Sequence, residues 1–131
     1  MQKEASLFKA LSDQTRLRLV SLLLFNGETC VCRLAQALGE PDFKISRHLG
    51  VMRSAGIVRA RREGTWMYYS LVKPRSAFEQ SCIEFLRRGM ENNRTLKKDL
   101  QRLSRSSCSI PGSNAGKNTP KNSSREKRSE I

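Results

Sequence analysis

Two cysteines, Cys30 and Cys32, lie one residue apart at the expected start of a helix. Thiolates are soft ligands that favour thiophilic ions. The first turn of a helix lowers the pKa of a thiol, because its unpaired N–H groups favour the thiolate. Residues two apart point to opposite sides of an ideal helix, so one ion could bridge both sulfurs only if the helix unwound locally. The pair predicts a thiol switch, although two small buried residues would give the same pattern.

The chain has two further cysteines, Cys82 and Cys108. Cys82 lies on an apolar stripe and is expected to be a core thiol. Cys108 follows the last expected helix; it is not assigned as a ligand, but it could reach back as a third one. Two or three thiolates suit trivalent arsenic or antimony, which are three-coordinate. A tetrahedral zinc site needs four Cys or His ligands, and the last helix has no histidine to offer.

A second cluster, from residue 43 to residue 62, contains six Lys or Arg residues and no Asp or Glu. A packing helix would normally carry both signs of charge, so this run favours contact with DNA phosphates over a solvated basic face. The predicted DNA contacts are Lys44, Ser46, Arg47, His48, Arg53, Arg59, Arg61 and Arg62. Arg47 is assigned to a bidentate contact with guanine. His48, the only histidine, is expected to face DNA or to pack, and not to be a metal ligand.

The charge of the whole chain agrees with a DNA partner. A net charge of +13 over 131 residues points to a polyanion, usually nucleic acid. No apolar run approaches the roughly 18 residues that a membrane span needs, and the N-terminus lacks the apolar stretch of a signal peptide. We therefore expect a cytoplasmic protein with no membrane partner, in which the four cysteines are reduced thiols.

Periodicity and capping residues predict the elements that must position these side chains. Four helices are expected first, over residues 3–10, 16–25, 30–38 and 43–54, with Thr29 as the cap of the third. Two strands, 57–62 and 65–71, then form a hairpin. Pro74 opens a last helix that runs to about residue 103. So small a domain cannot bury the whole apolar stripe of that helix, and a second subunit should cover it.

The third and fourth helices, with a turn at Gly39 between them, make a helix-turn-helix. The hairpin that follows is the wing of a winged version, in which the fourth helix enters the major groove. The predicted fold class is α+β and mostly helical, with a long C-terminal dimerisation helix. One domain covers residues 1–104, and residues 105–131, which are almost free of apolar side chains, are predicted to be a disordered basic tail.

Four ordered segments of the chain resemble the ArsR/SmtB family of winged-helix repressors, and within it the arsenic-responsive branch. Residues 10–18 are similar to the family's opening signature, and residues 28–34 to its ELCVCDL metalloid motif. Residues 44–56 resemble its recognition helix, and residues 64–71 match the G-x-W-x-x-Y-x-L of its wing.

This resemblance implies a homodimer joined by its first and last helices, with no enzymatic activity and no permanent cofactor. It also implies a repressor that leaves its double-stranded operator DNA when arsenite or antimonite binds Cys30 and Cys32. Some members carry a third cysteine where this chain has Ala35. A third ligand would then be Cys108, an exogenous thiol or hydroxide. Arg33 replaces the usual Asp and should favour the thiolate.

Several alternatives stay open on the same scaffold. In a redox sensor Cys30 and Cys32 would be oxidised and not metallated. A sensor of cadmium, lead or zinc would recruit further ligands, and a constitutive DNA-binding protein would ignore all of them. A small thiol enzyme is disfavoured, because no acid–base partner lies near the thiols in the sequence and the only histidine belongs to the DNA-reading segment.

Overall fold

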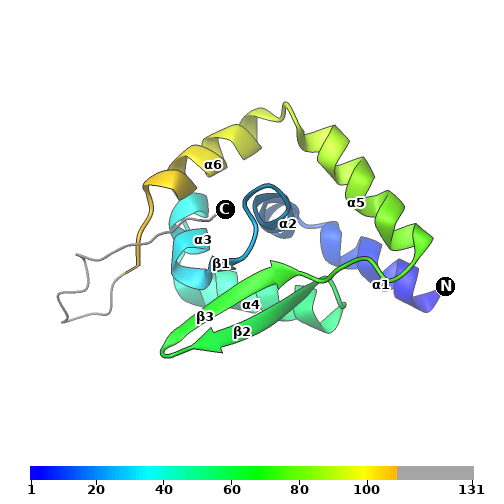
Figure 1. The fold of residues 1–131 in the computed structure, drawn as a ribbon, viewed down its shortest axis with the longest axis horizontal. Helices are drawn as coiled ribbons and strands as arrows, with labels where there is room; N and C mark the ends of the chain where they lie inside the picture. Colours follow the sequence, from blue (N-terminus) through cyan, green and yellow to red (C-terminus); the bar gives the residue numbers. More distant parts are fainter. Residues whose placement is uncertain (109–131) are drawn as a thin grey trace.

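The computed structural model describes residues 1–108, and residues 109–131 of the predicted tail lie outside that range. The elements, in chain order, are α1 (Gln2–Leu11), α2 (Gln14–Asn26), β1 (Thr29–Cys30), α3 (Val31–Leu38), α4 (Asp42–Ser54), β2 (Val58–Glu63), β3 (Trp66–Leu71), α5 (Ala77–Met90) and α6 (Arg94–Arg105). The predicted mostly helical architecture with one β-hairpin is confirmed. Figure 1 shows the hairpin at the lower side, in front of α4, with α5 and α6 arching over the opposite side.

Helix α2 runs through the centre of the fold. The Asp13 side chain caps it by accepting a hydrogen bond from the Arg16 backbone N–H at 3.1 Å. Leu19 and Leu22 are fully buried, as expected for a helix that is apolar almost all round. Gly27 ends the helix with a positive φ of 91°, a conformation that a residue with a Cβ adopts only with strain.

Helices α3 and α4 form the predicted helix-turn-helix. Gly39 closes α3 in the left-handed conformation, where its N–H and that of Glu40 satisfy the last free carbonyls of the helix. Helix α4 then turns its predicted stripe inward, because Ile45, Leu49 and Met52 are all fully buried. The opposite face of α4 is left open to solvent.

The sheet has three antiparallel strands in the order β1-β3-β2. The hairpin pairs Val58 with Leu71 and Glu63 with Trp66. Strand β1 was not predicted: Thr29 was expected to cap α3, but it pairs with Tyr69 instead. The backbone of β1 is extended to make this pairing, so the cap position of α3 falls on the next residue.

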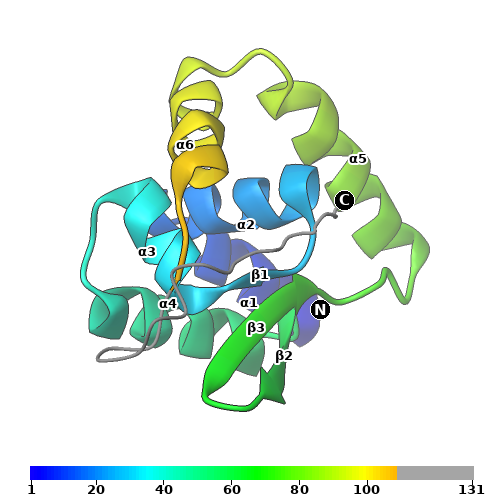
Figure 2. The same cartoon turned by 60° about the vertical axis from the view of Figure 1, so that its left-hand side comes forward.

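The C-terminal segment is two helices and not the single long helix expected. Helix α5 ends at Met90, and Asn93 begins α6 by accepting a hydrogen bond from the Leu96 N–H at 3.0 Å. The backbone of Asn93 is extended, with φ −70° and ψ 127°, so a continuous helix cannot pass through it. The chain changes direction there, as Figure 2 shows.

Helix α6 packs on α2 and α3 of its own subunit. Its Asp99 is fully buried and accepts two hydrogen bonds of 2.9 Å from the Arg18 guanidinium. Arg102, also on α6, donates to the Ala37 carbonyl of α3 at 2.7 Å. Asp99 holds the pKa of Arg18 above its usual value.

Within residues 1–108, no helix combines the length and apolarity that crossing a membrane requires.

Candidate functional site

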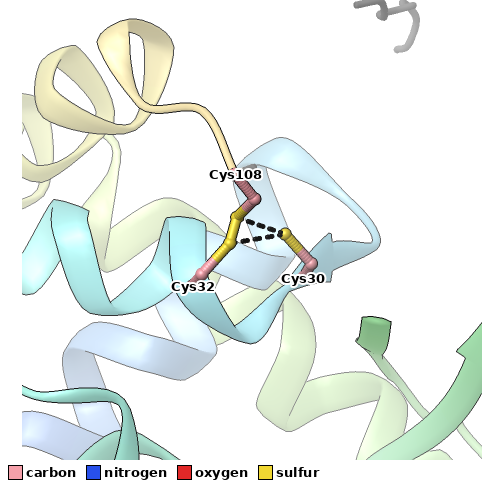
Figure 3. A group of neighbouring side chains, drawn as sticks. All are labelled: Cys30, Cys32 and Cys108. Carbon is pink, nitrogen blue, oxygen red and sulfur yellow. Dashed lines mark hydrogen bonds between the residues drawn. A yellow bond between two sulfur atoms is a disulfide. The ribbon is translucent and has the colours of Figure 1, made fainter. Parts of the chain in front are cut away.

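Three cysteine sulfurs meet at the start of α3 (Figure 3). The Sγ atom of Cys30 lies 3.5 Å from that of Cys32 and 3.1 Å from that of Cys108. Cys32 and Cys108 are joined as a disulfide, with their Cα atoms 6.0 Å apart. All three sulfurs lie within 4.8 Å of one another, which is close enough for a single ion to reach each of them.

The two sequence-predicted thiols do not share the first turn of a helix. Cys30 is the extended residue before α3, with φ −81° and ψ 156°, and Cys32 is the second residue of the helix. The expectation that their side chains diverge was therefore wrong, because it assumed helical geometry at both positions. Their sulfurs are already adjacent, so an ion can bridge them without unwinding α3.

The pKa of Cys30 is also different from the expectation. The Cys30 side chain is buried, and this burial raises the pKa of its thiol. The backbone N–H and the positive charge of Arg33 act in the opposite direction but do not outweigh burial. The start of the helix does act to lower the pKa of Cys30, as predicted, but this effect is smaller than the effect of burial.

Cys108 reaches the cluster because α3 holds the segment that follows α6. Arg33 donates to the Leu103 carbonyl at 3.0 Å and to the Ser106 hydroxyl at 2.9 Å. One turn further along α3, Gln36 donates to the Ser107 carbonyl at 2.7 Å. The predicted tail was expected to begin at residue 105, but the chain as far as Cys108 lies against α3.

The predicted DNA-reading side chains of α4 lie on its open face. Lys44, Ser46, Arg47 and Arg53 are all exposed. Lys44 makes a 3.4 Å ion pair with Glu40 of the preceding turn. Arg47 lies with its guanidinium carbon 5.8 Å from the centroid of the Phe43 ring, a side chain that is itself exposed. The helix therefore presents a convex, positively charged surface.

His48 is placed at the edge of this surface, between α4 and the start of α2. Its Nδ1 atom lies 3.2 Å from an Arg16 guanidinium nitrogen and 3.9 Å from an Asp13 carboxylate oxygen. Arg16 also donates to the Ala10 carbonyl at 2.6 Å. The sequence interpretation missed Arg16 and Asp13 as residues that fix the orientation of α4, and their place in the capping segment of α2 gave no signal of it.

The three wing arginines are not equivalent. Arg59 and Arg62 are exposed on β2. Arg61 donates to both carboxylate oxygens of Glu28, at 2.8 and 3.1 Å, and also contacts the Glu63 carboxylate. Its guanidinium lies 4.9 Å from the centroid of the Tyr68 ring, within the range of a cation–π interaction. Two acidic neighbours thus reduce the charge that Arg61 can offer to DNA.

Glu28, which the sequence interpretation missed, connects the wing with the thiol cluster. It precedes β1 directly, and β1 pairs Cys30 with Tyr68 of β3. Tyr68 in turn lies beneath Arg61. A change at the sulfurs therefore has a short route of backbone pairing and side-chain contact to the wing.

Comparison with known proteins identifies the wider group to which this arrangement belongs. A family model described as "Bacterial regulatory protein, arsR family" matches residues 13–60. An uncharacterized HTH-type transcriptional regulator of Methanocaldococcus jannaschii is 47% identical over 74 residues, which cover 56% of this chain and 83% of that protein. The chain belongs to the ArsR family.

Relatives in this family are named for different ions. The arsenical resistance operon repressor of Escherichia coli is 49% identical over 65 residues, or 50% of this chain and 56% of that protein. A CadC homolog of Staphylococcus aureus, named as a cadmium resistance regulator, is 42% identical over 67 residues, or 51% of this chain and 55% of that protein. The chain spans only about half the length of these two relatives.

Solved structures of similar chains agree with the winged helix-turn-helix. The homodimeric DNA-binding domain of Mb0332 from Mycobacterium bovis, described as a possible ArsR-family regulator, is 30% identical with a TM-score of 0.57. The match covers 69% of this chain and 80% of that one. This chain accordingly has the fold of the DNA-binding transcriptional regulators of the ArsR family.

Proposed function

We propose that this ArsR-family repressor is a homodimer that releases its operator when arsenite or antimonite binds Cys30 and Cys32. The main support for this proposal is that the sulfurs of Cys30 and Cys32 lie 3.5 Å apart at the junction between β1 and α3. That junction belongs to the sheet of the wing and to the helix-turn-helix at the same time. A ligand held there acts on both DNA-contacting parts of the fold.

On operator DNA, the exposed face of α4 enters the major groove and the wing follows the backbone. Arg47 reads guanine through a bidentate contact, with Lys44, Ser46 and Arg53 on base edges or phosphates. Arg59 and Arg62 contact the backbone or the minor groove. His48, at the edge of this face, contacts Arg16 and is the remaining DNA contact that we assign to α4.

The second subunit covers the apolar face of α1 and α5. Phe8 of α1 is 58% exposed and Phe85 of α5 is 77% exposed, which is unusual for large apolar side chains in a single subunit. Phe8 packs edge-on against Phe78 of α5, with the ring centroids 5.7 Å apart. An open groove of about 640 Å³ is lined by Phe78 and by other residues of α1 and α5, together with the segments that follow α4 and β3. The homodimeric relative supports a partner of the same sequence.

Binding of a fluorescent operator fragment, with and without arsenite at fixed salt, tests the proposal. Arsenite should weaken binding by the wild-type protein, whereas Cys30→Ser and Cys32→Ser should bind DNA normally and ignore arsenite. Cys82→Ser, which alters a cysteine outside the cluster, is the matched control and should respond like the wild type. Release of DNA by arsenite from a double Cys30→Ser/Cys32→Ser variant would contradict the ligand assignment.

The DNA-contact assignment has a test of its own. Arg47→Ala should reduce the preference for operator over random DNA by about 1–3 kcal/mol, the usual value of a bidentate base contact. Arg62→Ala should weaken both DNAs alike and reduce the salt dependence by about one unit of slope. Arg61→Ala should have a smaller effect than Arg62→Ala, because Glu28 and Glu63 already neutralise Arg61. If all three variants lost the preference for operator over random DNA equally, the assignment of Arg47 to bases and of the wing arginines to the backbone would be contradicted.

A redox sensor is the second candidate, because the sulfurs of Cys32 and Cys108 lie close enough together for oxidation to join them. In the redox alternative, peroxide alone releases DNA and a thiol reductant restores binding. A cadmium sensor, suggested by the staphylococcal relative, is separated in the same assay by comparing arsenite with cadmium, lead and zinc salts.

A further inference from the structure

We infer that Cys108 completes a three-thiolate metalloid site with Cys30 and Cys32 of the same subunit. This inference rests on the proposed metalloid response and adds its third ligand. The family position for a third cysteine is occupied here by Ala35, which is buried and offers no ligand atom. The fold supplies the missing sulfur from the far end of the chain, 78 residues after Cys30.

The three sulfurs come from three different pieces of backbone. Cys30 belongs to β1, Cys32 to the first turn of α3, and Cys108 to the segment after α6, as Figure 3 shows. Ligands from separate segments can converge on one side of an ion, whereas residues two apart on one helix point to opposite sides of it. All three sulfurs lie within 4.8 Å of one another, and within the described residues this is the only group of three or more ionisable side chains suited to a metal.

Helix α3 holds Cys108 in place through side chains that have no other evident role. The two hydrogen bonds of Arg33 fix the end of α6 and Ser106, and Gln36 bonds Ser107 through both ends of its amide. The residue before Cys108 is therefore tied at its carbonyl and its N–H. Such anchoring reduces the loss of chain freedom when a ligand is bound, and this favours capture by all three sulfurs. Arg33 and Gln36 act as positioning residues.

Arsenite takes part in the binding reaction as arsenous acid, As(OH)₃. The Cys32–Cys108 disulfide is first reduced by a cellular dithiol, which takes over the disulfide bond while both cysteines become thiols. Three thiols then react with As(OH)₃: three As–S bonds form, three As–O bonds break, and three waters leave with the thiol protons. Arsenic stays trivalent throughout. A pyramidal three-sulfur site leaves a tetrahedral ion such as zinc one ligand short.

Two arsenic probes separate a three-thiol site from a two-thiol site. Arsenite can bond three sulfurs, but phenylarsine oxide keeps its carbon bond and can bond only two. Binding of each is measured on the full-length protein, reduced with a phosphine and free of small thiols that could act as ligands. Cys108→Ser should weaken arsenite binding by at least about tenfold, because even the loss of a residue that only supports a ligand typically costs that much, and should leave phenylarsine oxide binding unchanged. Cys82→Ser should change neither.

The outcomes distinguish this inference from the proposed function. If Cys30→Ser and Cys32→Ser abolish arsenite binding while Cys108→Ser does not alter it, the two-cysteine function stands and the three-thiolate site is overturned. If Cys108→Ser weakens both probes equally, the third-ligand role is likewise overturned. If all cluster variants bind arsenite like the wild type, the proposed function fails as well. Thermal unfolding of each reduced variant checks that the fold is retained.

The positioning residues give a finer test. Gln36→Ala should weaken arsenite binding less than Cys108→Ser does, and should leave phenylarsine oxide binding unchanged. Gln36→Glu keeps the acceptor that faces the Ser107 N–H but sets a carboxylate oxygen against the Ser107 carbonyl, so it should weaken arsenite binding at least as much as Gln36→Ala does. Equal affinities for arsenite across this series would show that the hydrogen bonds to Ser107 do not position Cys108.

Discussion

Helices α5 and α6 follow each other along one apolar stripe of the sequence, but they bury it in different places. In α5 only Leu86 is buried within the subunit, and Phe85 beside it is 77% exposed. In α6 the inward face of Leu96, Asp99 and Leu103 is buried completely or almost completely against α2 and α3. One helix is thus available to a partner, and the other is part of the core.

Polar anchors make this difference. Asp99 is a buried carboxylate that needs the Arg18 guanidinium, so α6 can occupy only the place where the two groups meet. The exposed polar residues of α5 impose no comparable requirement. An apolar stripe shows that a helix must be covered, but the charged residues within it show whether the cover comes from the same subunit.

The strongest test of the comparison is the apolar face of α5. Phe85→Ser should leave the subunit folded and should weaken the dimer, because each buried Phe contributes about 1.5–3 kcal/mol. A two-fold interface contains the residue twice, so the loss per dimer is roughly 3–6 kcal/mol, or at least about 100-fold in the dissociation constant. Sedimentation equilibrium measures it. Lys98→Ser, exposed on α6, is the control, and equal weakening by both variants would contradict the assignment of the two helices.

Loss of the ion pair between Arg18 and Asp99, which anchors α6, should lower the stability of the subunit strongly. Arg18→Met keeps most of the side-chain packing but leaves Asp99 buried with Arg102 as its remaining partner. Breaking a buried ion pair typically costs roughly 3–5 kcal/mol, and we expect about 3 kcal/mol because Arg102 stays. Urea unfolding at a fixed protein concentration measures the free energy of unfolding. Arg88→Met, exposed on α5, should change it little; an Arg18→Met variant as stable as the wild type would show that packing alone holds α6.

Local sequence signals predicted most of the fold. The stripe of Ile45, Leu49 and Met52 identified the buried side of α4, and Gly39 marked the turn before it. The helix break was missed although its signal was present: Asn93 is a strong cap residue in front of Leu96. The apolar stripe continues through this cap, so periodicity alone predicts a single dimerisation helix.

The candidate site was only partly predictable, because its assembly depends on pairing between distant segments. Cys30 and Cys32 were found from their spacing, but their geometry depends on β1, and a two-residue strand forms only because β3 is there to pair with it. Cys108 was recognised as a thiol and not assigned as a ligand. Its approach to Cys30 depends on the turn at Asn93 and on the Arg33 and Gln36 contacts, none of which is visible in local periodicity.

The smallest predicted effect concerns the caps that keep the two helices separate. Asn93→Ala removes the cap of α6, and Ser76→Ala removes the matching cap of α5, which accepts from the Glu79 N–H at 3.1 Å. Each should destabilise its own helix by about 1 kcal/mol. The consequences should differ, because α6 belongs to the core and α5 to the interface. Asn93→Ala should lower the free energy of unfolding of the subunit, and Ser76→Ala should mainly raise the dimer dissociation constant.

Hydrogen exchange of the backbone amides can follow this last difference within one protein. In Asn93→Ala the first turn of α6 should lose protection at every protein concentration, because α6 packs on α2 and α3 of its own subunit. In Ser76→Ala the loss of protection in α5 should shrink as the protein concentration rises, because dimer formation restores the helix. A concentration-dependent loss in α6, or a concentration-independent one in α5, would show that the two helices share a single structural role after all.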